Sequence, residues 1–133
     1  MSSERTPILY DADCGFCRAS LALVLLWDRG RRLRPVDLRS AEADVLLGGM
    51  PEERRMASWH LIVADGVIHS AGAAAAPLLR LLPWGRPLAR AAERFPTATE
   101  RAYGCVAARR SALGRAIPLG LGRRAAALIE VRS

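Results

Sequence analysis

Lysine is absent from this 133-residue chain: all 20 basic side chains are arginine, and with 13 acidic side chains the formal net charge is +7. Aromatic residues are also scarce, at 5%, which leaves few rings on which nucleic-acid bases could stack. The arginines are spread among alanine and leucine rather than gathered in one run. A strongly basic chain can bind nucleic acid, but this pattern leads us to expect no nucleic-acid partner.

Long apolar segments are missing as well. The longest clean apolar run extends from Leu21 to Trp27, well short of the roughly 18 residues that a membrane-spanning helix needs. No apolar leader segment follows Met1, and we expect a cytoplasmic protein. The length and the hydrophobic fraction of 51% predict one domain over residues 1–133, which buries its core without metal or disulfide staples.

Cysteine occurs only three times. Cys14 and Cys17 form a close pair, and in the cytoplasm such a pair is more often catalytic or metal-binding than structural. A zinc site would need further ligands, and only Cys105, His60 and His69 remain, at spacings that match no common zinc pattern. We therefore predict no metal and no cofactor, with a metal-binding cysteine pair as an alternative. The distant Cys105 is predicted to be a small core residue.

Apolar and turn-forming segments alternate in the order β-α-β-α-β-β-α. The predicted strands are residues 6–11, 33–37, 59–64 and 67–69, and the predicted helices are residues 15–28, 40–47 and 71–82. A helix joins the first two strands, which makes them parallel. Pro35 places the second strand at the sheet edge, and Asp65-Gly66 predicts a hairpin turn. The sequence thus predicts an α/β, thioredoxin-like four-stranded mixed sheet, with residues 84–133 as a helical C-terminal extension.

Several local features are also predicted. Asp13 is expected to cap the first helix, and Ser70 to cap the helix that Pro83 ends. Residues 52–55 are expected to be a charged connection to the third strand. Trp84 stands between Pro83 and Gly85 and is expected to be a packing anchor.

The segment Cys14-Gly15-Phe16-Cys17 opens the first predicted helix. Free N–H groups and the helix dipole favour negative charge at a helix N-terminus, so we expect Cys14 to act as the nucleophilic thiolate. Cys17 lies one turn further on the same face and is expected to resolve the mixed disulfide. Gly15 and Phe16 are expected to shape substrate access. Asp11 is a candidate proton carrier, although aspartate at such a position can also serve only to shape the turn.

The segment from Ile8 to Cys17 resembles the signature of the DCC family of thiol–disulfide oxidoreductases, Tyr-Asp-Gly-x-Cys-x-x-Cys. The matching residues are Asp11, Cys14 and Cys17, whereas Ala12 replaces the usual glycine. The similarity continues through residues 34–38, the hairpin region and the helices up to about residue 110, although residues 108–111 depart from an Asn-Arg-Tyr-like stretch of the family. The resemblance implies a thioredoxin-like fold and an oxidoreductase whose partner is a protein or small-molecule thiol or disulfide.

Thioredoxin-like proteins usually carry a cis-proline just before the third strand, but this chain has Met56-Ala57-Ser58 there. We therefore expect Ser58 and Trp59 to contact the substrate. One alternative function is a non-catalytic binding module, which would dock through the arginine-rich tail over residues 109–132. Peripheral membrane contact by this tail is the weaker option, because glycine and proline interrupt it.

Overall fold

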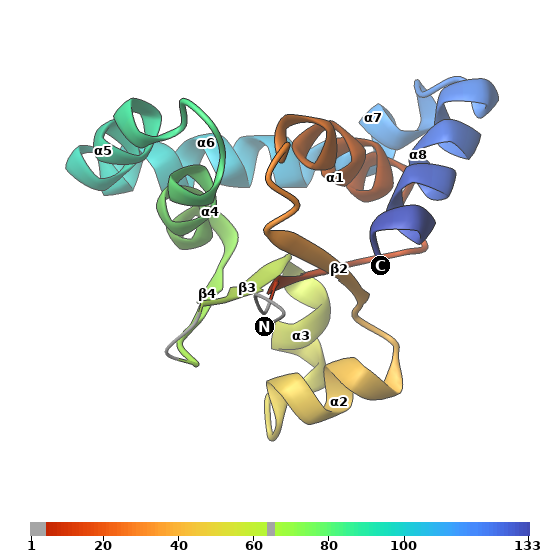
Figure 1. Ribbon diagram of the computed structural model, residues 1–133, viewed down its shortest axis with the longest axis horizontal. Coiled ribbons are helices and arrows are strands. Elements are labelled where there is room, and N and C mark those ends of the chain that lie inside the picture. Colours follow the sequence, from red (N-terminus) through yellow and green to blue (C-terminus); the bar gives the residue numbers. More distant parts are fainter. Residues whose placement is uncertain (1–4, 64–65) are drawn as a thin grey trace.

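Four strands form one mixed sheet in the order β2-β1-β3-β4 (Figure 1). The computed structural model describes residues 5–63 and 66–133. The strands are β1 (Thr6–Tyr10), β2 (Leu33–Asp37), β3 (His60–Ile62) and β4 (Ile68–Ser70). The helices are α1 (Gly15–Trp27), α2 (Ala41–Leu47), α3 (Glu52–Ala57), η1 (Ala71–Ala74), α4 (Ala75–Leu81), α5 (Arg86–Arg94), α6 (Pro96–Ala108), α7 (Arg110–Arg115) and α8 (Leu119–Arg132).

The strand directions are those of a thioredoxin-like sheet. β1 runs parallel to β2, β3 runs antiparallel to β1, and β4 runs antiparallel to β3. β2 lies at the edge of the sheet, as predicted from Pro35. Proline has no backbone N–H to donate, and an edge strand has no second neighbouring strand that would need one. The predicted α/β class and thioredoxin-like four-stranded mixed sheet are therefore confirmed. The predicted turn at Asp65-Gly66 falls partly on Asp65, which lies outside the described residues.

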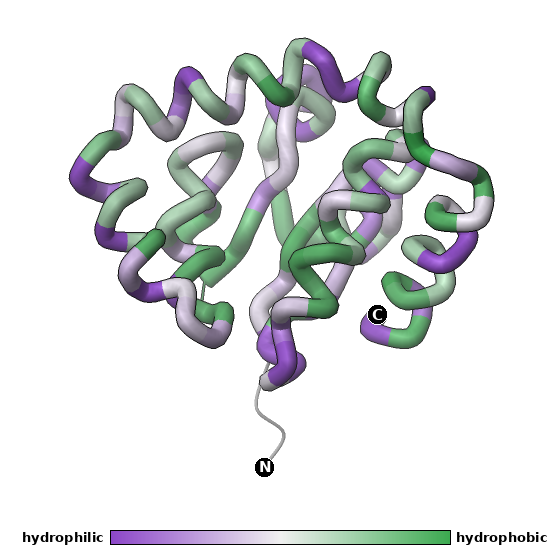
Figure 2. The backbone as a smooth tube through the Cα atoms, turned by 90° about the horizontal axis from the view of Figure 1, so that it is seen from above, coloured by the Kyte–Doolittle hydropathy of each residue, from purple (hydrophilic) through white to green (hydrophobic). Residues whose placement is uncertain are grey.

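Alternation along β1 divides the apolar core between the two faces of the sheet. Ile8 faces a core that α1, α4 and α8 cover, and its neighbour Leu9 faces a smaller core under α2. Fully or nearly fully buried members of the first core are Leu21, Leu25, Leu33, Leu61, Leu78, Leu82 and Ile129. The outer helices alternate hydrophobic and hydrophilic residues, as Figure 2 shows, because each has only one face to bury.

The end of α1 is tied to the start of β2 by a buried carboxylate. Asp28 has no exposed surface, and its two oxygens accept hydrogen bonds from the backbone N–H groups of Arg32 and Leu33 at 3.0 and 2.9 Å. The Asp28 carbonyl in turn accepts from the Arg132 guanidinium at 3.2 Å. This network holds the C-terminal helix α8 against α1, whose N-terminus carries the cysteine pair.

Two glycines, Gly72 and Gly114, allow α6 and α7 to pack closely against neighbouring elements. A Cβ atom on Gly72 in η1 would lie 2.9 Å from the Cα of Glu100 in α6, so a larger residue would displace that helix. A Cβ atom on Gly114 in α7 would lie 3.2 Å from the backbone nitrogen of Phe16 in α1. The first contact places α6 against η1, and the second places α7 against the N-terminus of α1, beside which Figure 1 shows it.

Several local predictions were wrong. Residues 52–55 are not a connection but belong to α3. The predicted helix over residues 71–82, by contrast, is confirmed to within one residue, with the 3₁₀ turn η1 leading directly into α4, which ends at Leu81. Ser70 makes no capping hydrogen bond, because its hydroxyl pairs with Nδ1 of the buried His60 at 2.6 Å. Trp84 is not a packing anchor, since 90% of it is exposed.

Candidate active site

Cys14 lies at the junction between β1 and α1 and is the N-cap residue of the helix. Its Sγ accepts a hydrogen bond from the backbone N–H of Cys17 at 3.4 Å, and its own N–H donates to the Asp11 carbonyl at 3.1 Å. The thiol thus occupies the position that a serine or aspartate oxygen takes in most caps. The predicted cap residue Asp13 therefore has another role, because the Asp13 carboxylate pairs with Arg39 at 3.0 Å.

Asp11 is held at the end of β1 by two contacts to the same carboxylate oxygen. This Oδ1 accepts from the backbone N–H of Asp13 at 3.0 Å, which closes the turn before the cysteine pair. It also pairs with the Arg39 guanidinium at 2.6 Å. The turn-shaping function considered from sequence is thus present, and the same carboxylate also lines the cavity beside Cys17.

Cys17 is half-buried and lines the cavity. Burial, a hydrogen bond with Cys14 and the charges of Cys14 and Asp11 raise the pKa of the Cys17 thiol from 9.0 to about 12, against the opposing effect of the Arg110 guanidinium. The two cysteines therefore differ in setting: Cys14 caps the helix outside the cavity lining, whereas Cys17 faces an apolar interior that disfavours its thiolate.

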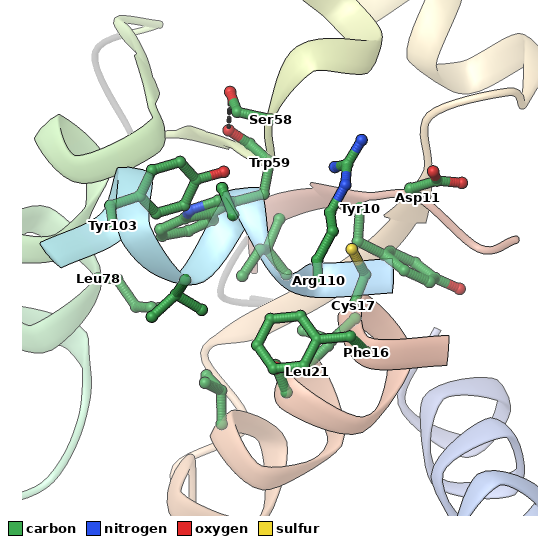
Figure 3. Close-up of a pocket in the computed structure, with 15 residues that line it drawn as sticks. Tyr10, Asp11, Phe16, Cys17, Leu21, Ser58, Trp59, Leu78, Tyr103 and Arg110 are labelled. Carbon is green, nitrogen blue, oxygen red and sulfur yellow. Dashed lines mark hydrogen bonds between the residues drawn. The ribbon is translucent and has the colours of Figure 1, made fainter. Parts of the chain in front are cut away.

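The cavity beside Cys17 has a volume of about 280 Å³, and the residues that line it are spread along the chain from Ile8 to Arg110 (Figure 3). Its lining comprises Ile8, Tyr10, Asp11, Phe16, Cys17, Ser20, Leu21, Val24, Ser58, Trp59, Leu78, Tyr103, Val106, Ala107 and Arg110. Most of these side chains are apolar. The arrangement can hold a small apolar group next to a sulfur atom.

Three of the four residues predicted to contact a substrate line this cavity, namely Phe16, Ser58 and Trp59. Gly15 does not. A Cβ atom there would lie 3.6 Å from the Gly114 carbonyl oxygen, so Gly15 sits against α7 rather than facing the cavity. Cys105 is exposed on α6 and lies outside the cavity lining, so its prediction as a core residue was wrong.

Sequence reasoning missed the wall that α6 and α7 provide. Tyr103, Val106, Ala107 and Arg110 line the cavity, and their spacing of i, i+3, i+4 and i+7 is that of one helix face. The pKa of Tyr103 is raised, because the effect of burial exceeds the opposing effect of hydrogen bonds between its hydroxyl and the Trp59 main chain and Ser58 side chain. Figure 3 shows this hydroxyl pointing toward both residues.

No group of three or more histidine, cysteine, aspartate or glutamate side chains able to hold a metal ion occurs in the described parts of the chain. Over the same residues, none of the helices combines the length and apolar character needed to cross a membrane.

Comparison with protein-family models matches residues 8–116 to the family described as DCC1-like thiol-disulfide oxidoreductase. The matched region runs from β1 to the residue after α7, so it includes both the cysteine pair and the helical wall of the cavity. No curated protein and no solved structure matches the chain.

Proposed function

Because the chain belongs to the DCC1-like thiol-disulfide oxidoreductase family, we propose that it catalyses thiol–disulfide exchange with Cys14 as the attacking thiolate and Cys17 as the resolving thiol. Membership supports a general thiol–disulfide redox function. The observation that carries the assignment of roles is the different setting of the two cysteines. Cys14 lies at the helix start, outside the cavity lining, whereas Cys17 lies in the cavity wall with its pKa raised to about 12.

In the proposed reaction the Cys14 thiolate attacks a substrate disulfide and releases one substrate thiolate. The Cys17 thiol then loses its proton and attacks the Cys14 sulfur, which releases the second substrate thiol and forms the Cys14–Cys17 disulfide. One substrate disulfide is thereby reduced to two thiols while two protein thiols are oxidised. The Asp11 carboxylate, which lines the same cavity, is proposed to accept the Cys17 proton.

Equilibration in glutathione redox buffers tests this function. We expect Cys14 and Cys17 to form a disulfide in a reversible two-electron transition, with a potential between roughly −270 and roughly −120 mV, the range of known oxidoreductases. The measurement traps the thiols and reads their state by mass spectrometry. It uses a Cys105→Ser background, because the exposed Cys105 would otherwise form intermolecular disulfides. Cysteines that never pair, or pair irreversibly, would contradict the proposal.

The Asp11→Asn substitution is expected to slow release of the second substrate thiol by about 100-fold, since positioned proton carriers typically contribute at least that much. Stopped-flow single turnovers between pH 6 and pH 10 would measure it. The sign is diagnostic. The Asp11 charge raises the pKa of Cys17, so an Asp11 that acted only as a neighbouring charge would, on removal, favour the Cys17 thiolate and speed the step.

Asp13→Asn provides the matched control for this experiment. Asp13 also pairs with Arg39 but is largely exposed, and it is not among the cavity-lining residues. It should leave both the rate and its pH profile unchanged. If both variants slowed the reaction equally, the effect would come from loss of the Arg39 contacts and not from proton transfer.

A further inference from the structure

Arg110 is a charged side chain in an otherwise largely apolar cavity wall. It is half-buried at the start of α7 and makes no ion pair with any residue in the ranges 5–63 and 66–133. Its electrostatic effect reaches both the Cys17 thiol and the Tyr103 hydroxyl. A guanidinium in such a setting is stabilised when an anion binds to it, because apolar surroundings strengthen the attraction between the two charges.

The anion is not supplied by the protein residues around the cavity. Among the described lining residues, Asp11 is the one carboxylate, and its Oδ1 is already paired with Arg39 at 2.6 Å. Figure 3 shows Arg110 and Asp11 as separate side chains near Cys17. Among the described residues, the cavity wall therefore carries both Cys17 and a guanidinium that makes no ion pair, together with aromatic and aliphatic side chains.

Resting on the proposed function, we propose that this cavity binds a low-molecular-weight thiol or disulfide that carries an aromatic or branched apolar group and a carboxylate. The carboxylate pairs with Arg110, whose planar fork accepts it in a bidentate manner. The apolar group packs among residues such as Trp59, Leu78 and Val106. A volume of about 280 Å³ is at the small end of ligand sites, which favours one ring-sized group over a dinucleotide or a folded partner.

The same exchange reaction applies to this substrate class. The Cys14 thiolate attacks one sulfur of the disulfide and expels one anionic substrate thiolate. Cys17 then displaces the second, so that one substrate disulfide becomes two thiols and the protein becomes oxidised. Return of the protein to the dithiol form requires a reducing thiol or dithiol, such as glutathione.

A ligand without sulfur separates recognition from redox chemistry. We expect 3-phenylpropionate to bind the reduced wild-type protein in isothermal titration calorimetry, and its neutral amide to bind more weakly. Arg110→Gln should weaken binding of the carboxylate by about 10- to 100-fold, as loss of a charged hydrogen bond does, and leave binding of the amide unchanged. Arg109→Gln is the matched control, because Arg109 is exposed and outside the lining, and it should change neither.

A second variant covers the case in which Arg110→Gln fails to fold. Val106 lines the cavity but is 44% exposed, so Val106→Trp can fill the cavity without overpacking a closed core. It should abolish binding of both ligands. The proposal is overturned if neither ligand binds the wild type, if the two bind equally, or if Arg110→Gln and Arg109→Gln behave alike.

Kinetics with two aromatic disulfides would connect this binding to turnover. Arg110→Gln should lower the rate with 5,5′-dithiobis(2-nitrobenzoate), which carries carboxylates, about tenfold more than the rate with the uncharged 4,4′-dithiodipyridine. If the rates fall equally while the glutathione titration still shows a reversible pair, only the substrate class is wrong. If that titration fails but phenylpropionate binds through Arg110, the proposed function is wrong and the binding site remains.

Discussion

Cys14→Ser is expected to abolish disulfide exchange, with the rate falling by more than roughly 10³-fold, because a serine hydroxyl cannot replace a thiolate as nucleophile. The variant should also form no adduct with glutathione disulfide. Both measurements are made in the Cys105→Ser background, which itself should retain the activity of the wild type, since Cys105 is not part of the cavity lining. The readout is the rate of substrate thiol release together with the intact mass of the protein.

Cys17→Ser should give a different result from Cys14→Ser. The first exchange at Cys14 still occurs, but no second thiol is present to resolve it, so a stable mixed disulfide with one glutathionyl group accumulates at Cys14. Peptide mapping locates the adduct. An adduct that forms at Cys17 in the Cys14→Ser protein, and none at Cys14 in the Cys17→Ser protein, would show that the roles are reversed. Full activity of both variants would show that the function does not depend on the cysteine pair.

Alkylation of Cys17 by iodoacetamide is expected to be about 10³-fold slower in the folded protein than in urea at pH 7.5. Raising the pKa from 9.0 to about 12 lowers the thiolate fraction at that pH by about 10³-fold, and only the thiolate reacts. Tandem mass spectrometry at low extents of modification separates Cys17 from Cys14 within one peptide. The exposed Cys105 serves as the internal reference.

The pH profile separates this electrostatic effect from simple shielding. If the raised pKa limits the reaction, the rate at Cys17 should rise about tenfold per pH unit from pH 7 to about pH 11. Shielding alone would give a profile that levels off near pH 9. Folding favours the neutral thiol, so its contribution to stability is complete below pH 9 and is lost as the pH rises toward 12.

Much of the fold could be predicted from local sequence patterns. The strand over residues 33–37 has the predicted bounds, because apolar residues around Pro35 already identify an edge strand. Ser40, where the second helix is predicted to start, caps α2 by accepting from the Ala43 N–H at 3.2 Å. The first helix begins at Gly15 as predicted, directly after Cys14. Each of these features depends on residues within a few positions of one another.

The features that were missed depend on contacts between distant segments. Cys105 follows Tyr103 by two positions, so it lies on the helix face turned away from the cavity and is exposed. Ser70 is the last residue of β4, and its hydroxyl is hydrogen-bonded to the His60 ring, ten positions earlier in the chain. The spacing of Tyr103 and Arg110 in the sequence could show that they share one helix face. It could not show that this face lies beside the cysteine pair, because that depends on the close approach of α6 to η1 at Gly72.

The cavity is assembled from several stretches that lie far apart in the chain. Two of them are residues 14–17, which bring Cys17, and residues 103–110, which bring Arg110 and part of the apolar wall. Gly114, four residues after the second stretch, lies against Phe16 in the first. Under the proposed function, substitutions in the second stretch are expected to change which molecule is accepted and to leave the cysteine pair itself in place. The two proposed properties, reactivity and selectivity, could then be altered one at a time.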